Sequence, residues 1–498
     1  MDNCKKNKFE RLSNWLVGHI ITVIILFCLV SFGIVCFIYL FKYPDHLRFF
    51  ELLYFIPVII LFLIEILIIL KSIHIKHYLV LWSVIFILKS IIIILCLNSP
   101  PQGDGGGIFN EALYLSQGGD FALDSSNYYY NCYWLMWTVY VEKIIIDVLG
   151  VGYGFFKTIG MLCLLGSGLI IYNIANRLFN ERLAKIVFGI YVVFVPISLC
   201  VSQFSHQHLA FFLLLLSIYL MISEVWYKWA LAGLTCGIMN GFRPWGILLL
   251  LTACIYFIYC IFKKKNKFLY RFLLLIIFFI VYKLTGMCIN QILIISGYYD
   301  PQVLNDSMIW IKIDRGIDPE MNSFGKYAEK YAVSHAGTNA ELISIRNELY
   351  KKHVIELLKS AAPYTYIANK MVRMFGEVDY WFENCFANKL SILQYPNRIL
   401  YFFNWFQYII VVIFAFVGKL RDKNDKVVNM LSIFTIGYFF AHIFIEAFSS
   451  YRLCIYPCLL MYAALGIDKM YIKYSSCFTA FTDYLHHNIH NRTSRLKH

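Results

Sequence analysis

Four acidic residues and no lysine or arginine occupy positions 99–124, "SPPQGDGGGIFNEALYLSQGGDFALD". Asp104 follows a Pro-Pro turn and precedes three glycines, which allow close backbone approach and let its carboxylate project into a cleft. A carboxylate within reach of a hydroxyl can act as a general base. Asp104 is therefore the candidate base. Glu111 is a candidate helper that shares its face only if the stretch is helical, which the glycines argue against. Asp120 is a weaker candidate for substrate binding, because it and Asp124 also fit a solvated acidic turn.

Two arginines interrupt apolar stretches, Arg243 in "GFRPWG" and Arg452 in "IEAFSSYRLCIYP". An arginine at a membrane boundary is costly unless it pairs or binds an anion, and its forked guanidinium suits phosphate. Pairing with Glu446 or Asp104 is the alternative. Together with a carboxylate base, these arginines predict sugar transfer from a lipid-linked phosphosugar, in which they offset the charge on the departing phosphate.

The composition indicates a membrane protein that crosses the bilayer several times. The chain has 498 residues, of which 60% are hydrophobic, against about 45–50% in soluble domains. Apolar runs long enough to cross a bilayer recur from end to end, and the first, from about Trp15 to Leu40, is longer than a signal-peptide core. The net charge of +14 lies in short clusters between these runs, as in cytoplasmic loops, so nucleic-acid binding is excluded as the explanation.

The positions of the basic clusters predict the topology. The N-terminus, "KSIHIKH", "NRLFNERLAK" and "KKKNK" are basic and are expected inside. Twelve spans follow, with both termini cytoplasmic: about 15–41, 51–70, 79–98, 153–173, two that flank the outer turn 202–208, two that flank the outer turn 240–246, 269–295, 397–418, 430–447 and 453–470. The segment 133–149 is expected as an amphipathic helix at the outer interface.

The predicted fold is an all-α polytopic bundle with a mostly helical extracytoplasmic insert. Residues 1–295 form an N-terminal transmembrane module with the catalytic first outer loop, 99–133. Residues 296–395 form the insert, 396–470 the last transmembrane helices and 471–498 a cytoplasmic tail. In the insert, apolar residues recur at helical spacing until Pro363, which is expected to break the helix.

The cysteines predict neither a zinc site nor redox chemistry. The chain has 15 of them, most lie inside apolar runs, and no Cys-x-x-Cys pair occurs. Cys132 and Cys385 lie in polar-flanked regions, and a disulfide between them stays open beside the alternative of free buried thiols.

Four features resemble the polytopic glycosyltransferases of the GT-C superfamily, which includes the protein O-mannosyltransferases and the aminoarabinose transferases of lipid A. The first outer loop opens with a prolyl turn and Asp104 and continues "FNEALYLSQGGDF". The aromatic segment "YYYNCYWLMW" comes next. "GIMNGFRPWGILLLL" is similar to an Arg-Pro hairpin, and "EAFSSYRLCIYPCLLMYAALG" to a late Glu…Arg-Tyr…Pro hairpin, with Tyr451-Arg452 in reversed order.

The resemblance implies a GT-C-like bundle and inverting transfer from a polyprenyl-phosphate sugar to a glycan, lipid or protein acceptor on the outer face. It implies Asp104 as the base and Arg243 and Arg452 as the phosphate contacts. Further candidate substrate contacts are Glu446, Lys370, Arg373 and His335. No cofactor is required. Asp104 and Glu111 could hold a divalent cation, but two carboxylates without a nearby histidine do not specify one. Abundant Ile, Lys and Asn indicate an AT-rich bacterial genome and hence a plasma-membrane enzyme that acts on the cell envelope.

Two other classes remain. A polymerase or ligase of envelope polysaccharides also has many spans and a large outer loop, but is expected to concentrate arginines in that loop. A transporter of lipid-linked saccharides is expected to show repeats and polar residues at the membrane midplane, whereas the polar candidates here lie at the outer boundary.

Overall fold

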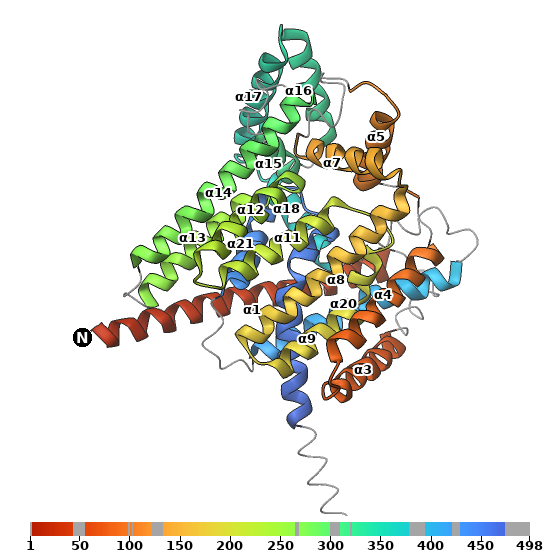
Figure 1. Cartoon of the computed structure of the whole chain (residues 1–498), viewed down its shortest axis with the longest axis vertical. Helices are drawn as coiled ribbons and strands as arrows, with labels where there is room; N and C mark the ends of the chain where they lie inside the picture. The colour runs from red at the N-terminus through yellow and green to blue at the C-terminus, as the bar shows by residue number, and fades with distance from the viewer. Residues whose placement is uncertain are drawn as a thin grey trace, which may run out of the picture.

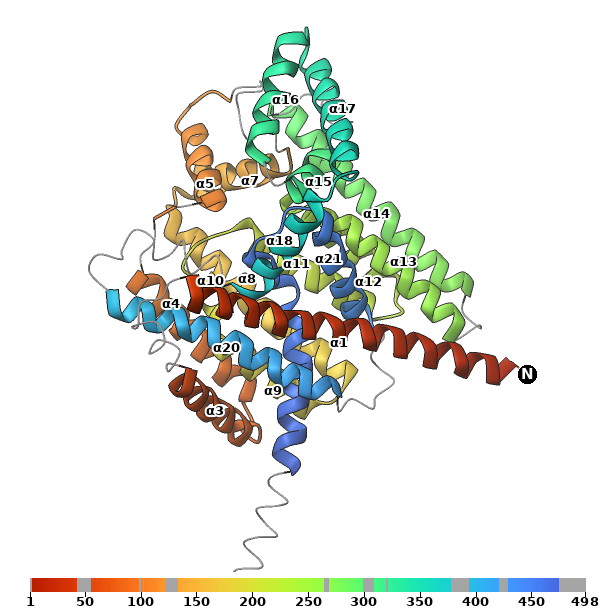
Figure 2. The ribbon, with the colours of Figure 1, turned by 180° about the vertical axis from the view of Figure 1, so that it is seen from behind.

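The protein is built from helices. The computed structural model describes residues 2–42, 55–97, 100–101, 103–121, 133–263, 268–298, 309–318, 321–377, 394–420 and 429–473, and these contain no strand. The predicted all-α class is therefore confirmed for the described part of the chain. Figures 1 and 2 show a tall molecule with a helical projection at one end and the last described helix leaving from the other.

The first half of the chain supplies helices on both sides of the bundle. They are α1 (Asp2–Lys42), α3 (Phe55–Ser72), α4 (Tyr78–Leu97), α5 (Gly103–Ser116), α7 (Tyr133–Leu149), α8 (Tyr153–Leu178), α9 (Glu181–Val193), α10 (Val195–Cys200), α11 (His206–Met221), α12 (Trp226–Phe242) and α13 (Gly246–Lys263). The crossing expected before residue 202 is divided into α9 and α10. Pro196 lies in the first turn of α10, where its missing N–H costs nothing but ends the preceding helix.

The second half supplies the long α14, the projecting helices and the end of the bundle. They are α14 (Phe268–Ile295), α15 (Ile309–Ile317), α16 (Met321–His335), α17 (Asn339–Leu357), α18 (Ala362–Gly376), α20 (Gln394–Leu420), α21 (Met430–Phe444), the 3-10 turn η3 (Ser449–Cys454) and a helix at 456–473. We call α15, α16 and α17 the cap; α16 and α17 stand at the top of Figure 1.

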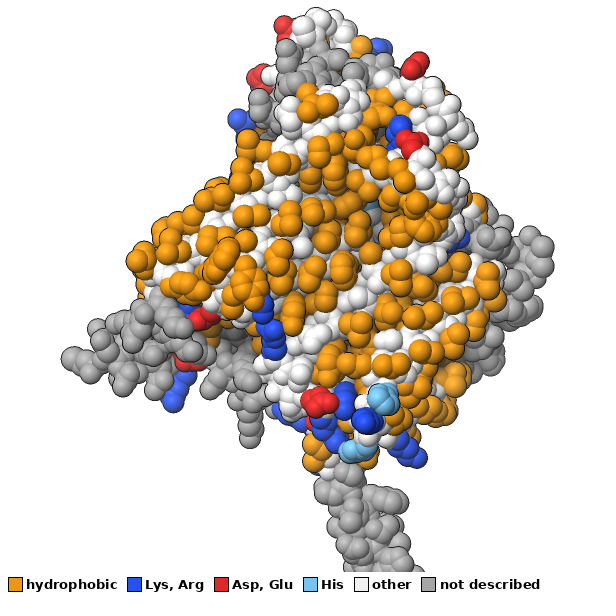
Figure 3. Space-filling view, in the orientation of Figure 1, with side chains coloured by type: hydrophobic (Ala, Val, Ile, Leu, Met, Phe, Trp, Pro, Cys, Tyr) orange, Lys and Arg blue, Asp and Glu red, His pale blue; other side chains and the backbone are white. Residues whose placement is uncertain are grey.

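Six described helices are long and apolar enough to cross a membrane: Glu10–Ile38, Phe55–Ser72, Tyr78–Cys96, Tyr153–Leu178, Phe268–Ile295 and Phe402–Leu420. Their outer surfaces keep large apolar side chains exposed, among them Leu95 at 71% and Ile295 at 77%, which lipid accommodates and water does not. In Figure 3 hydrophobic side chains cover the middle of the visible face, and charged side chains gather toward its ends. The molecule thus has the helices and surface of a membrane-spanning protein.

The connection from α3 to α4, the start of α9 and the helix at 456–473 lie together at the end opposite the cap (Figure 1). Lys185 donates to the carbonyl of Ile73 at 3.1 Å, and the Tyr78 hydroxyl donates to the carbonyl of Lys185 at 2.7 Å. Arg182 forms an ion pair with Asp468 at 2.8 Å. Segments far apart in the sequence are therefore joined at this end of the molecule.

Glycine allows α5 to lie directly on the segment 201–205. A Cβ at Gly105 would stand 2.3 Å from the carbonyl oxygen of Phe204, so any other residue would push the helix away. The expectation that the glycines make this stretch non-helical is wrong, because α5 runs from Gly103 to Ser116. The outer turn 202–208 is buried under this helix rather than exposed.

The insert 296–395 is not wholly separate from the bundle. Its helix α17 ends at Leu357 and α18 begins at Ala362 with Pro363 in the first turn, which confirms the predicted break. A Cβ at Gly376, at the end of α18, would stand 2.5 Å from the carbonyl oxygen of Ser31 in α1. Since Met374 and Phe375 also belong to the main core, α18 packs as part of the bundle while α15, α16 and α17 project.

Candidate functional site at the cap side of the bundle

Asp104 lies in the first turn of α5, where its side chain is exposed. A carboxylate in the first turn is stabilised by the helix dipole. Glu111 follows seven residues later on the same helix and so lies on the same face, about two turns away. The Glu111 side chain is half-buried, and this burial raises its pKa.

Arg243 lies just beyond α12 in extended backbone. Its N–H donates to the carbonyl of Met239 at 2.8 Å, and its own carbonyl accepts from the N–H of Trp245 at 2.7 Å. The guanidinium carbon stands 5.6 Å from the ring centroid of Tyr451. The Nε atom is buried without a hydrogen-bond partner in the described part of the chain. The tight turn thus aims a cation at Tyr451 and leaves a buried donor unused.

Glu446 follows α21 in a segment that Lys370 holds in place. The Nζ of Lys370 donates to the carbonyls of Gly316 at 2.5 Å, Ile445 at 2.8 Å and Ile443 at 3.1 Å. A Cβ at Gly316 would stand 2.2 Å from the carbonyl oxygen of Phe444, so only glycine permits this approach of α15. Lys370 therefore ties the cap and α18 to the segment that carries Glu446.

The charges of these side chains act on one another. Burial raises the pKa of Glu446, and four charged side chains act on the same carboxyl: Arg315, Asp104, Arg243 and Lys312. Burial likewise raises the pKa of the Tyr451 hydroxyl to about 12, with further effects from Arg243, Glu446 and Asp104. We call Asp104, Arg243, Glu446 and Tyr451 the cap-side cluster.

The charged groups of the cap-side cluster are close without being neutralised in pairs. Among the residues that the structure describes, no ion pair within 4.0 Å involves Asp104, Arg243 or Glu446. Such an arrangement leaves the carboxylates able to accept protons or hydrogen bonds and leaves the guanidinium able to bind an oxyanion.

Arg452, the other predicted phosphate contact, lies in the core. Its side chain is 2% exposed, its Nε donates to the carbonyl of Ser449 at 3.1 Å, and its guanidinium carbon stands 4.5 Å from the ring centroid of Tyr408. Its charge acts on Cys28 and Tyr408. Arg452 therefore contacts Ser449 and Tyr408 in the core.

The remaining candidates are scattered. Asp120 is exposed beyond the end of α5. His335 ends α16, where its exposed ring stacks on Tyr331 at 4.0 Å. Arg373 is exposed and stands 3.5 Å from Glu377. Asp124, Cys132 and Cys385 lie outside the described residues.

Three residues near the cluster were not singled out in the sequence. His206 is 1% exposed, neither of its ring nitrogens has a hydrogen-bond partner in the described part of the chain, and the charge of Arg243 reaches it. Lys312 and Arg315 come from α15 and act on Glu446. The signal for His206 was its place in the turn 202–208, which the topology assigns to the same side as Asp104; α15 offered no comparable signal.

One group of metal-ligating types lies outside the cap-side cluster. Asp314, Asp318 and His353 place one ligand atom each within 4.8 Å of one another. The sequence predicted no metal site, and none of these three residues was a candidate.

No protein-family model matches the chain, and no curated protein matches it at a significant level.

Proposed function

We propose that the protein is a membrane glycosyltransferase of GT-C type. It moves a sugar from a polyprenyl-phosphate donor to an envelope glycan, lipid or protein acceptor at the cap side of the bundle. The observation that carries this proposal is the cap-side cluster. Asp104, Arg243 and Glu446 come from three distant parts of the chain, and the charges of Asp104 and Arg243 both act on Glu446 and Tyr451. None of the three has an ion-pair partner within 4.0 Å in the described part of the chain.

Each group has a role that fits its position. Asp104 is exposed in the first turn of α5 and accepts the proton of the acceptor hydroxyl as its oxygen attacks the anomeric carbon. The bond from that carbon to the phosphate oxygen breaks, the configuration inverts, and the phosphate leaves with the bonding electrons. Arg243 binds the phosphate, and Lys312 and Arg315 add positive charge beside it. Glu446 accepts hydrogen bonds from substrate hydroxyls.

The proposed setting is a plasma membrane that the chain crosses twelve times, with both termini cytoplasmic. The six long apolar helices are joined by three shorter ones, His206–Met221, Gly246–Phe262 and Met430–Phe444. Helices also lie at the other three expected spans, in α9 with α10, in α12 and at 456–473. The joining of basic loops at the end away from the cap supports a cytoplasmic position for that end.

The test is sugar transfer by the purified full chain in nanodiscs that contain a radiolabelled polyprenyl-phosphate sugar. We expect Asp104→Asn to lower the initial rate at least about 100-fold, the usual scale for a lost general base, with an unchanged melting temperature. Glu348→Gln is the matched control, because it neutralises an acid of α17 that pairs with Lys352 at the surface.

Three outcomes would contradict or redirect the proposal. Full activity of a folded Asp104→Asn variant excludes Asp104 as the base. Movement of intact donor across the bilayer without cleavage of the sugar–phosphate bond would indicate a transporter. Products that lengthen by many sugar units in each event would indicate a polymerase.

A further inference from the structure

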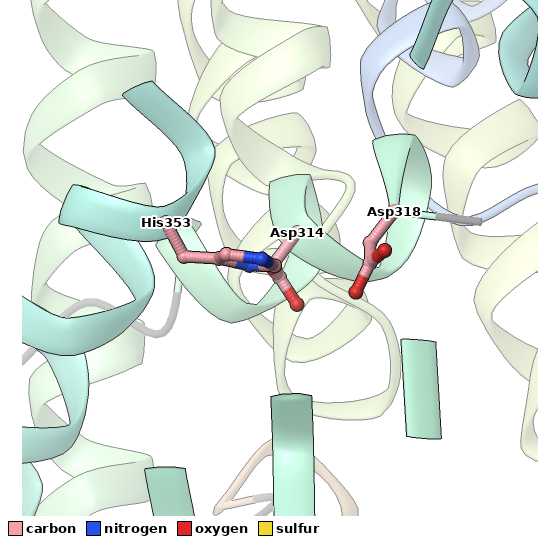
Figure 4. A group of neighbouring side chains, drawn as sticks. All are labelled: Asp314, Asp318 and His353. Atoms are coloured by element: carbon pink, nitrogen blue, oxygen red, sulfur yellow. The ribbon is translucent and has the colours of Figure 1, made fainter. Parts of the chain in front are cut away.

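Two acids and a histidine meet inside the cap, and none of them belongs to the cap-side cluster. Asp314 and Asp318 lie one helical turn apart at the end of α15, and His353 reaches them from α17. Figure 4 shows the His353 ring beside Asp314 and a carboxylate oxygen of each aspartate directed toward the space between them. The three ligand atoms lie within 4.8 Å of one another.

The burial of Asp314 calls for a second partner. This residue is 0% exposed. Its Oδ1 lies 2.8 Å from Nδ1 of His353, whereas its Oδ2 is buried and has no hydrogen-bond partner in the described part of the chain. A buried carboxylate oxygen without a partner costs free energy, unless a cation or a water occupies the space it faces.

The charge of the buried carboxylates also favours a bound cation. Asp318 is 3% exposed, so two carboxylates are buried side by side. A divalent ion between the two carboxylates would offset the cost of burying their charges.

We propose that Asp314, Asp318 and His353 bind one divalent cation of the zinc type, with water completing the coordination. Two carboxylate oxygens and one imidazole nitrogen are a donor set that suits Zn²⁺, whereas Mg²⁺ and Ca²⁺ favour oxygen ligands alone. Tetrahedral coordination with bonds of about 2.0–2.2 Å requires ligand atoms roughly 3.3–3.6 Å apart, so a small movement of the side chains forms the site.

The cation would act as a structural clamp and not as a catalytic group. It joins α15 to α17 beside the small cap core of Ile311, Ala328 and Tyr350. Since α15 also carries Lys312 and Arg315, the clamp would hold these two cations toward Glu446. The site does not depend on the proposed function, because it uses none of the cap-side cluster.

The test measures zinc binding to the full chain in nanodiscs after removal of metal with a chelator. We expect one equivalent of Zn²⁺ to bind by titration calorimetry and to raise the melting temperature, as a ligand of the folded state must. Asp314→Asn and His353→Gln should each weaken this binding at least about tenfold and abolish the thermal shift. Glu348→Gln, an exposed acid on α17, should leave both unchanged.

The binding data decide the matter in either direction. Zinc that binds the wild type and both variants with equal affinity and stoichiometry belongs to other histidines and overturns the proposal, as does a wild type that binds none. If Asp314→Asn cannot be isolated folded, His353→Gln decides, because its side chain is only half-buried and its loss leaves both carboxylates in place.

Discussion

The two polar ends of the bundle differ in whether their charged side chains form ion pairs. Away from the cap, Arg182 pairs with Asp468 at 2.8 Å, Lys185 pairs with Glu181 at 2.9 Å, and Arg271 pairs with Glu224 while also donating to a carbonyl at 2.9 Å. In the cap-side cluster, Asp104, Arg243 and Glu446 are near one another but form no ion pair within 4.0 Å in the described part of the chain.

The charges at the end away from the cap form ion pairs that join segments of the chain. The charges of the cap-side cluster are not paired and can bind a ligand. A paired charge at a helix end stabilises the local structure and has little capacity left for another molecule. Charges held close without pairing cost stability and are found where binding or catalysis needs them. The cap-side cluster is of the second kind, so changes there should affect activity more than folding, and changes at the other end should do the reverse.

The largest expected effect is at Lys370. This residue lies on the cap side, but its charge is used to hold segments of the chain together. Lys370→Met leaves three carbonyls without their charged donor, and we expect a loss of about 3 kcal/mol in the free energy of unfolding. Sugar transfer should fall with it, because α15 and the Glu446 segment separate.

Denaturation in detergent micelles with increasing sodium dodecyl sulfate measures this loss. The control is Lys352→Met, which removes an exposed lysine paired with Glu348 on α17 and should change stability little. A Lys370→Met variant that is as stable as the wild type but inactive would contradict the assignment, because Lys370 would then act on substrate.

A smaller effect, of opposite sign on stability, is expected at Glu446. Its folded-state pKa is raised, chiefly by burial, from an ordinary value of 4.5. The favourable contribution of its protonated form is therefore complete below about pH 4.5 and is lost as the pH rises through the folded-state pKa. Glu446→Gln should consequently be more stable than the wild type at pH 7 and equally stable at pH 4, while transfer falls about tenfold, the scale of one lost hydrogen bond to substrate.

Thermal unfolding at pH 4 and pH 7, together with transfer rates, checks this prediction. Glu348→Gln is the control with the opposite sign, because a hydrogen bond from Lys352 lowers the pKa of Glu348, and its removal should give no gain at pH 7. A Glu446→Gln variant that loses stability at pH 7 would show that Glu446 is a paired structural charge.

Much of the fold can be predicted from the sequence, because long apolar runs and basic loops can be recognised in a single sequence without knowledge of the tertiary contacts. All-helical structure, the helix break at Pro363 and the helix at 133–149 were accessible in this way. The helicity of α5 was not. Its glycines weaken a helix in isolation, and only the contact of Gly105 with Phe204 explains why they are there.

Part of the candidate site could be predicted from the sequence, because some of its residues stand out from their local sequence pattern whereas others depend on contacts between distant residues. Asp104 and Arg243 could be singled out because each interrupts the pattern around it. Arg452 also interrupts its pattern, but its neighbour Tyr408 lies more than 40 residues away and holds it in the core. The group of Asp314, Asp318 and His353 joins two helices across a gap of 35 residues, a distance at which spacing alone carries no information.

The most direct test of the contrast between the two ends is the binding of a polyprenyl phosphate to matched arginine variants in nanodiscs. Arg243→Gln removes a cation of the cap-side cluster, and Arg271→Gln removes a cation whose partner is Glu224. We expect Arg243→Gln to weaken binding at least about tenfold, or 1.4 kcal/mol, without loss of stability, and Arg271→Gln to lower stability without a change in binding. Equal affinity of Arg243→Gln and wild type, or weaker binding by Arg271→Gln alone, would contradict the account.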